Sequence, residues 1–331
     1  MSVPLIDPHN RTVRDLRVSI TDRCNFRCTY CMPEEGMKWL PREELLTYEE
    51  LTRVAKVCVE RFGFESIRIT GGEPTVRAHL PVLVRRLADL GVDLAMTTNG
   101  ATLAQQAGDL ARAGLRRINI SLDTLKPDRF AAITGRQALA QVLEGIDAAL
   151  GAGLDPVKVN CVLVRGLNDD EILDFATFGR TKGVEVRFIE WMPLDAAGRW
   201  SSEQVVSASE VVEVIDSEWP LVAPDGGRAG DAAPAESYRY ADGGGRVGVI
   251  ASVTRQFCDS CDRIRLTAEG QLRNCLFSVR ETDLRTILRS EGTDDDLATA
   301  IEAEVGRKWA GHSIGQVHFI RPVRSMSQIG G

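Results

Sequence analysis

Three cysteines stand close together near the N-terminus, at Cys24, Cys28 and Cys31. A disulfide uses two thiols and a closed structural zinc site uses four ligands, so a local group of three favours a metal centre with an open position. An iron–sulfur cube held by three cysteines meets that description, because one iron stays free to bind another molecule. The spacing therefore predicts an iron–sulfur centre, and the alternative is a zinc knuckle completed from elsewhere in the chain.

A second group of three cysteines lies far along the chain, at Cys258, Cys261 and Cys275, again without an obvious local fourth ligand. It offers a second open metal centre of the same kind. The alternative is a zinc site that takes its fourth ligand from one of three distant residues, His312, His318 or Cys161.

Two arginines follow the second group and bear on this choice. Arg263 and Arg265 share a face if the segment is extended, directly beside the cysteines. Guanidinium groups at that place suit a phosphate or a purine edge better than a structural zinc knot. The pattern favours a substrate site.

The composition sets wider bounds. The chain has 331 residues, a net charge of −7 and eight cysteines. We expect one large domain with a smaller one, in a cytoplasmic protein without a membrane segment and without general nucleic-acid binding. Cysteines in such a compartment indicate metal binding or catalysis more than disulfides. Cys58 and Cys161 lie in apolar patterns and are predicted core residues.

Strand-like and helix-like segments alternate from residue 15 to about residue 192. The predicted strands are 16–21, 66–71, 94–98, 117–123, 157–164 and 184–192. The predicted helices are 48–62, 80–90, 103–113, 139–150 and 170–182. About six such repeats predict a parallel sheet with helices outside it, either doubly wound or a partial barrel.

Charged residues inside the strands favour the partial barrel. Arg17, Arg68 and Lys158 each share a strand face with other polar residues, whereas both faces of a doubly wound sheet are apolar. The alternative is that these cations lie at strand ends and pair with outer helices. Cations pointing into a barrel are costly unless an anion fills it, so the pattern predicts an anionic ligand.

The alternation ends after Trp191, and we place a domain boundary there, giving domains 1–195 and 196–331. The second is predicted to be a smaller α+β domain that closes the barrel mouth. Its expected parts are helices 208–218, 284–290 and 296–309, strands 237–240 and 248–253, and a mobile loop 223–245.

The first cysteine group, with Tyr30 before its last member, resembles the radical S-adenosylmethionine (SAM) enzymes. The resemblance implies that the open iron binds the methionyl moiety of SAM and that the reduced cluster cleaves the sulfonium to a 5'-deoxyadenosyl radical. Within this family, the run Thr70-Gly-Gly-Glu-Pro74 holds the methionine amino group. The implied SAM contacts are Tyr30, Gly72, Glu73, Ser121 and Met192.

The chain as a whole is similar to the molybdenum-cofactor GTP 3',8-cyclases, the MoaA family. The motifs that carry this likeness are Thr97-Thr-Asn-Gly, Asn119-Ile-Ser-Leu-Asp, residues 258–277 and the ending Met326-Ser-Gln-Ile-Gly-Gly331. The likeness implies a second cluster whose open iron binds the guanine of GTP. The implied GTP contacts are Arg17, Arg68, Thr97, Lys158, Arg263 and Arg265, and the implied catalytic residues are Arg263, Arg265 and Arg17.

The resemblance also implies an activity and partners. It implies radical cyclisation of GTP to (8S)-3',8-cyclo-7,8-dihydroguanosine 5'-triphosphate, with two 4Fe–4S clusters and SAM. It further implies a flavodoxin or ferredoxin as electron donor, a homodimer, and a cyclic pyranopterin monophosphate synthase acting on the product. The Gly-Gly tail is expected to enter the active site, with Arg321 or Arg324 near the substrate.

Two other functions remain open at this point. A radical SAM enzyme that modifies a peptide also carries auxiliary clusters in its C-terminal part, but more auxiliary cysteines and a peptide groove would be expected. A non-enzymatic iron–sulfur electron carrier would not need this set of cations or a barrel of this size. Both alternatives are disfavoured.

Overall fold

The structure is a computed structural model that describes residues 2–32, 37–194, 198–223, 233–317, 319–322 and 324–330. Within these ranges the strands form one large twelve-stranded sheet and a separate pair, β1 (Leu5–Ile6) and β2 (Thr12–Val13). No helix in these ranges is both long enough and apolar enough to cross a membrane.

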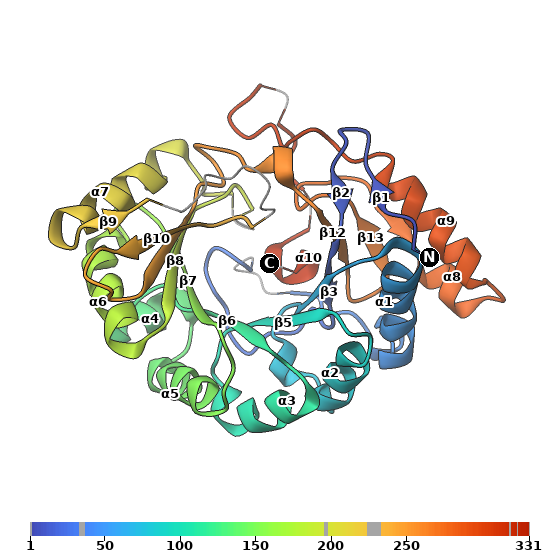
Figure 1. Ribbon diagram of the computed structural model, residues 1–331, viewed down its shortest axis with the longest axis horizontal. Helices are drawn as coiled ribbons and strands as arrows, with labels where there is room; N and C mark the ends of the chain where they lie inside the picture. The colour runs from blue at the N-terminus through green and yellow to red at the C-terminus, as the bar shows by residue number, and fades with distance from the viewer. Residues whose placement is uncertain are drawn as a thin grey trace.

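Six parallel strands in chain order form the centre of the large sheet. They are β3 (Asp15–Ser19), β4 (Ser66–Thr70), β5 (Asp93–Thr98), β6 (Arg117–Ser121), β7 (Val157–Leu163) and β8 (Glu185–Glu190). Each corresponds to a predicted strand, and the sheet curves into an open ring (Figure 1). The predicted partial barrel is confirmed.

The helices that connect these strands lie outside the ring (Figure 1). They are α1 (Tyr48–Phe62), α2 (Leu80–Ala88), α3 (Ala107–Ala113), α4 (Pro127–Thr134), α5 (Leu139–Gly151) and α6 (Ile172–Lys182). Helix α4 was not predicted, because eight residues are too few to display a clear helical period. Helix α1 shows why the ends were predictable: Thr47 and Glu50 form a capping box, and Gly63 ends the helix with φ 71°.

The two faces of the strands differ as the sequence predicts. In β3 the side chains of Leu16 and Val18 are fully buried in the main hydrophobic core beneath the helices. Arg17 lies between them and therefore points to the opposite, inner face. The same alternation runs through all seven residues of β7.

The C-terminal part adds strands to both ends of this sheet. β11 (Arg246–Ile250) pairs in parallel with β8, and β12 (Arg263–Leu266) pairs in parallel with β3. Beyond them lie the antiparallel strands β9 (Leu221–Val222), β10 (Glu236–Tyr240), β13 (Gln271–Arg273) and β14 (Thr282–Asp283). The two parts of the chain therefore share one sheet, and the boundary at residue 195 stays a prediction.

The described residues of the C-terminal part also form the helices α7 (Ala208–Glu218), α8 (Arg285–Arg289), α9 (Asp294–Val305) and α10 (Met326–Ile329). Short 3-10 helices occur at Arg42–Glu44, Pro74–Val76, Leu103–Gln105, Asp169–Glu171, Ser202–Gln204 and Cys258–Ser260. Helix α10 lies inside the ring of strands in Figure 1. Much of the expected mobile loop, residues 224–232, falls outside the described ranges.

Candidate active site

The first cysteine group lies on the loop that follows β3. All three thiols are free and partly buried. The backbone N–H of Phe26 donates to the Cys24 sulfur at 3.4 Å, and the Asn99 amide lies 3.7 Å from the same sulfur. Burial raises the pKa of Cys24 to about 11 and that of Cys31 to about 12. Thiolates buried at this place need strong stabilisation by positive charge, which a metal cluster would supply.

The Gly-Gly run after β4 brings this loop close to the sheet. The Gly72 N–H donates to the Thr21 carbonyl at 2.7 Å, and the Glu73 N–H donates to the Arg23 carbonyl at 2.8 Å. A Cβ on Gly72 would lie 2.4 Å from the Arg23 carbonyl oxygen. A glycine is thus required at this position because the cysteine loop passes too close for any side chain. The sequence did not reveal this role.

The Glu73 carboxylate is fully buried and is held by donors from two strand ends. It accepts hydrogen bonds from the backbone and hydroxyl of Thr75, from the Thr98 hydroxyl at 2.6 Å and from the Asn99 N–H at 2.6 Å. Burial raises its pKa although these donors oppose the rise. Glu73 therefore ties the ends of β4 and β5 together beneath the cysteine loop.

Tyr30, within the first cysteine group, is anchored to the end of β6. Its hydroxyl donates to the buried carboxylate of Asp123, whose other oxygen accepts from the Val162 N–H at 2.8 Å. Burial raises the pKa of Asp123 to about 6 and raises that of Tyr30 well above its usual range. Asp123 is the last residue of the Asn119-Ile-Ser-Leu-Asp motif, and its partner on the cysteine loop gives it a role that the sequence did not reveal.

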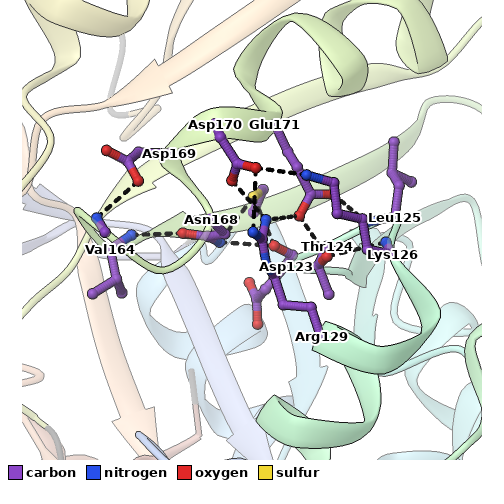
Figure 2. Close-up of polar contacts among 12 residues, drawn as sticks. Asp123, Thr124, Leu125, Lys126, Arg129, Val164, Asn168, Asp169, Asp170 and Glu171 are labelled. Carbon is purple, nitrogen blue, oxygen red and sulfur yellow. Dashed lines mark hydrogen bonds and ion pairs between the residues drawn. The ribbon is translucent and has the colours of Figure 1, made fainter.

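Figure 2 shows how Asp123 is held in turn by the loop after β7. Asn168 donates to the Asp123 carbonyl at 2.7 Å and accepts from the Val164 N–H at 2.8 Å. Beside it, the fully buried Glu171 accepts from the Thr124 hydroxyl at 2.6 Å. These contacts fix the loops after β6 and β7 relative to each other.

A small cavity brings three of the relevant elements together. It is lined by Tyr30 of the cysteine loop, Met192 after β8 and Met326 of α10, among other residues. Ser121 ends β6 opposite Asn160 and is not among the residues that line it. Of the predicted SAM contacts, the structure thus groups Tyr30 with Met192 at this cavity.

Three arginines lie side by side on the inner face of adjacent strands. In the register of the sheet, Arg265 of β12 is opposite Arg17 of β3, which is opposite Arg68 of β4. Burial and mutual repulsion lower the pKa of Arg68 and of Arg265 to about 9. The row places several positive charges in a buried position.

The described residues neutralise this row only in part. Within the described residues, Nε of Arg17 and both Nε and Nη1 of Arg68 are buried without a hydrogen-bond partner. The carboxylate of Asp15 is 3.9 Å from Arg17. Buried, unsatisfied guanidinium donors are costly, and an anionic ligand would satisfy them.

Lys158 lies in an ion-pair network with a glutamate and a further arginine. Its ammonium lies 3.7 Å from Glu185, which also pairs with Arg187 at 2.7 Å. Burial and the charge of Arg187 lower the pKa of Lys158 to about 8. Arg187 and Glu185 are inner-face residues that sequence reasoning missed, although the alternation in the last strand carried the same signal as Arg17. Thr97 lies opposite Asn119, which is opposite Lys158.

The second cysteine group lies at the start of β12 and the end of β13. Cys258 and Cys261 precede β12, and Cys275 follows β13. Although burial raises the pKa of Cys261, the positive charges of Arg263 and Lys308 lower it to about 7. The second group therefore lies at the N-terminal end of β12, whereas the first group follows the C-terminal end of its parallel neighbour β3. The arginine row lies between the two groups along these strands.

The spread of the cysteines bears on the zinc alternatives. Across the described ranges, no three His, Cys, Asp or Glu side chains are placed to hold a single metal ion. The ligands of one zinc all lie about 2.3 Å or less from the same point, whereas the cysteines of a cube bind separate irons. His312 packs on Phe277 and accepts from the Ile314 N–H, and His318 lies outside the described residues.

Comparison with known proteins places the chain in a family. The Radical SAM superfamily model matches residues 18–179, and the Molybdenum Cofactor Synthesis C model matches residues 184–314. A GTP 3',8-cyclase of Streptomyces coelicolor is 48% identical over 99% of this chain and 96% of its own length. A GTP 3',8-cyclase 2 of Mycobacterium tuberculosis is 48% identical over 99% of this chain and 92% of its own length. This chain belongs to the GTP 3',8-cyclase family of radical SAM enzymes.

Solved structures support the fold of this GTP 3',8-cyclase family member. Streptococcus suis SuiB bound to its precursor peptide SuiA has a TM-score of 0.60 at 13% identity, over 89% of this chain and 68% of that one. At that identity the likeness concerns the fold alone. The full-length relatives are GTP 3',8-cyclases, so the peptide-modifying alternative loses its support.

The tail of this GTP 3',8-cyclase family member enters the ring. Ser19 donates to the Ile329 carbonyl at 3.2 Å, and Arg265 donates to the Gly330 carbonyl at 2.5 Å. Arg324 forms ion pairs with two carboxylates, those of Glu269 and Glu281. A role for Arg324 at the substrate stays a prediction, as does one for Arg321, and Gly331 lies outside the described residues.

Proposed function

We propose that the chain carries out its family's reaction, the radical cyclisation of GTP that begins molybdenum cofactor biosynthesis, on the inner face of the sheet. The observation that carries this proposal is the row formed by Arg265, Arg17 and Arg68. Its buried donors without partners call for an anion, and the row lies between two cysteine groups. A triphosphate is an anion of suitable charge, and guanidinium groups bind its oxygens well.

The chain's own residues would bind and orient the nucleotide. Arg17, Arg68 and Lys158 would hold the triphosphate, with Thr97 beside them. Arg263 and Arg265 would contact GTP next to the second cysteine group, and with Arg17 they would stabilise charge that develops during the reaction. Their support is geometric, because all project from the inner face or lie beside the cysteines.

Two 4Fe–4S clusters would complete the site. Cys24, Cys28 and Cys31 would hold the first, and Cys258, Cys261 and Cys275 would hold the second. The proposed SAM contacts are Tyr30, Gly72, Glu73, Ser121 and Met192. When bound, the first cluster and SAM supply the radical chemistry that joins the ribose 3' carbon to C8 of the guanine.

The enclosure of the site would protect this chemistry. Met192 and Met326 line the cavity beside Tyr30, and α10 lies inside the ring of strands (Figure 1). Together they would exclude water and fix the distance between SAM and GTP. A flavodoxin or ferredoxin as electron donor, a homodimer, and a synthase that consumes the cyclised nucleotide complete the proposal.

One anaerobic experiment tests the proposal. After cluster reconstitution, iron and sulfide are counted and 5'-deoxyadenosine is measured with and without GTP. We expect two four-iron clusters and SAM cleavage that depends on GTP. Serine substitution of either cysteine group should remove half of the iron, whereas Cys58→Ala, a buried cysteine outside both groups, should remove none.

The outcome also separates the rival functions. Cleavage of SAM that is indifferent to GTP would reject the cyclase proposal. Full iron without any SAM cleavage would instead indicate an electron carrier. One cluster with GTP-dependent cleavage would retain the reaction and reject the second cluster.

A further inference from the structure

A buried lysine lies beside the second cysteine group. Lys308 is 4% exposed. Its ammonium donates to the Arg263 carbonyl at 2.8 Å and to the Asn274 carbonyl at 2.6 Å, and it lies 3.7 Å from the sulfur of Cys261. Arg263 follows Cys261 by two residues and Asn274 directly precedes Cys275. One side chain thus contacts both segments that carry the cysteines.

The end of α9 fixes the position of this lysine. The Lys308 N–H donates to the Val305 carbonyl at 2.9 Å, which closes a turn directly after the helix. The Asn274 amide donates to the Glu304 carbonyl at 3.2 Å and so docks the helix end on the end of β13. Lys308 therefore points inward from a packed element and is not a mobile surface side chain.

In the described part of the chain, no carboxylate pairs with the ammonium of Lys308. Among the described residues, the partners of its ammonium are two carbonyls and one sulfur. Arg11 offers a contrast, because it also binds this loop, through the Cys258 carbonyl at 2.7 Å, but pairs with Asp7 at 2.6 Å. A buried cation without an anion is costly, so a negative group belongs next to Lys308.

A cluster on the second cysteine group would be that negative group. Three thiolates make a four-iron cube net negative, and one-electron reduction adds a further negative charge. Hydrogen bonds to ligand sulfurs and nearby charge are known to set cluster potentials.

We propose that Lys308 is the counter-ion of the second cluster and a positioning residue for it. The ammonium donates a hydrogen bond to the Cys261 sulfur, stabilises the reduced form more than the oxidised form, and so raises the reduction potential. This inference rests on the proposed second cluster.

The test measures the potential of the second cluster directly. Cys24, Cys28 and Cys31 are replaced by serine in the full chain, so that only the second cluster contributes to the spectrum. A mediated redox titration followed by electron paramagnetic resonance then compares three substitutions, Lys308→Gln, Lys308→Arg and Arg11→Gln. Gln keeps a donor for the carbonyls but loses the charge, and Arg keeps both.

We expect Lys308→Gln to shift the potential to more negative values and Lys308→Arg to leave it close to that of the parent. Arg11→Gln should lower cluster retention without moving the potential, because Arg11 touches the loop backbone and not the sulfur. Equal shifts in Lys308→Gln and Arg11→Gln would overturn the proposal, since loosening of the loop would then explain both. An unmoved potential in Lys308→Gln would overturn it as well.

A second measurement does not depend on how a variant folds. The chain with unsubstituted Lys308 is labelled with ¹⁵N-lysine, and the electron paramagnetic resonance of the reduced second cluster is recorded. We expect a coupling between the electron spin of the cluster and a lysine ¹⁵N nucleus, and Lys308→Arg should remove it. A reduced cluster without this coupling would contradict the proposal. If no iron binds to the second cysteine group at all, the proposal of a second cluster is rejected, and the proposed role of Lys308 is rejected with it.

Discussion

The inner-face cations differ in how fully the described protein groups satisfy them. Arg17 and Arg68 have buried donors without partners in the described structure, whereas Lys158 shares Glu185 with Arg187. A triphosphate would therefore meet a site with excess positive charge on one side and a pre-formed ion pair on the other. Among these cations, Lys158 has the pKa nearest neutral pH, at about 8.

Lys158 is expected to make GTP binding weaken above neutral pH. Its pKa is lowered to about 8, so the free protein loses this charge as the pH rises through 8, and an anion then binds less well. We expect about a tenfold loss of GTP affinity between pH 7 and pH 9, the order of one charge-assisted hydrogen bond of about 1.5 kcal/mol. Calorimetric titration with GTP measures it.

Lys158→Arg is the matched control, because the guanidinium keeps its charge across this range. Its affinity should fall less than that of the unsubstituted protein from pH 7 to pH 9, because Arg68 and Arg265, with pKa values lowered to about 9, titrate only at the upper end of this range. An equal fall in both proteins would assign the pH dependence to another group.

Asp123 is expected to act on SAM through Tyr30. Asp123→Asn removes the charge that accepts the Tyr30 hydroxyl, which costs about 1.5–3 kcal/mol for a buried charged hydrogen bond. We expect SAM affinity to fall about tenfold while the iron content stays unchanged, as measured by binding titration and iron analysis. Asp170→Asn is the control in the same network, because Asp170 is half exposed and such pairs contribute under about 1 kcal/mol. Equal effects of the two substitutions would contradict the role of Asp123.

At the scale of elements, the short helix α10 is held inside the sheet by its own backbone. The backbone of Ser327 lies close enough to Cys31 to oppose the rise in the pKa of its thiol, and the Gly330 carbonyl accepts from Arg265. The tail thus touches the first cysteine group and the arginine row together. Removal of Gly330 and Gly331 should abolish cyclisation while both clusters persist, and unchanged turnover would refute a role for the tail.

Gly330→Ala tests the same contact without shortening the chain. A Cβ at Gly330 would lie 2.1 Å from the Ser19 hydroxyl, at a residue with φ 80°. We expect the tail to leave its place and turnover to fall at least tenfold, measured as cyclised product per enzyme. Gly91→Ala is the control, because Gly91 has φ 75° and open space around its Cβ position, so only a backbone cost of about 1–2 kcal/mol remains. Activity lost equally in both would point to global instability.

At the scale of the whole molecule, the two predicted domains share one sheet. β8 depends on β11 for one neighbour and β3 depends on β12. The α1 side chains of Arg53 and Arg61 also pair with Asp294 and Asp295 of α9. Separation at residue 195 would therefore expose two strand edges and remove part of the cover of α1.

We expect the full chain to unfold in one transition and the fragment 1–195 to aggregate. Urea unfolding of the cluster-free protein, followed by circular dichroism and by tryptophan fluorescence, should give coincident curves. Two separate transitions, or a soluble fragment with native-like dichroism, would instead support independent domains.

Local pattern determined much of this protein. The cysteine spacings, the strand alternation that turned Arg17 and Arg68 inward, and the caps of α1 all depend on residues near one another in the chain, so sequence alone could predict them. The partial barrel followed from the same alternation. Arg187 could have been found this way as well.

Only the tertiary structure decided which distant groups meet. The addition of β11 and β12 to opposite ends of the sheet, the contact of Tyr30 with Asp123, and the approach of Lys308 to Cys261 join segments separated by many residues. No local period encodes such pairs, because they depend on strand order and helix docking. For the same reason, only the tertiary structure explains why position 72 needs a glycine, since the cysteine loop passes directly against it.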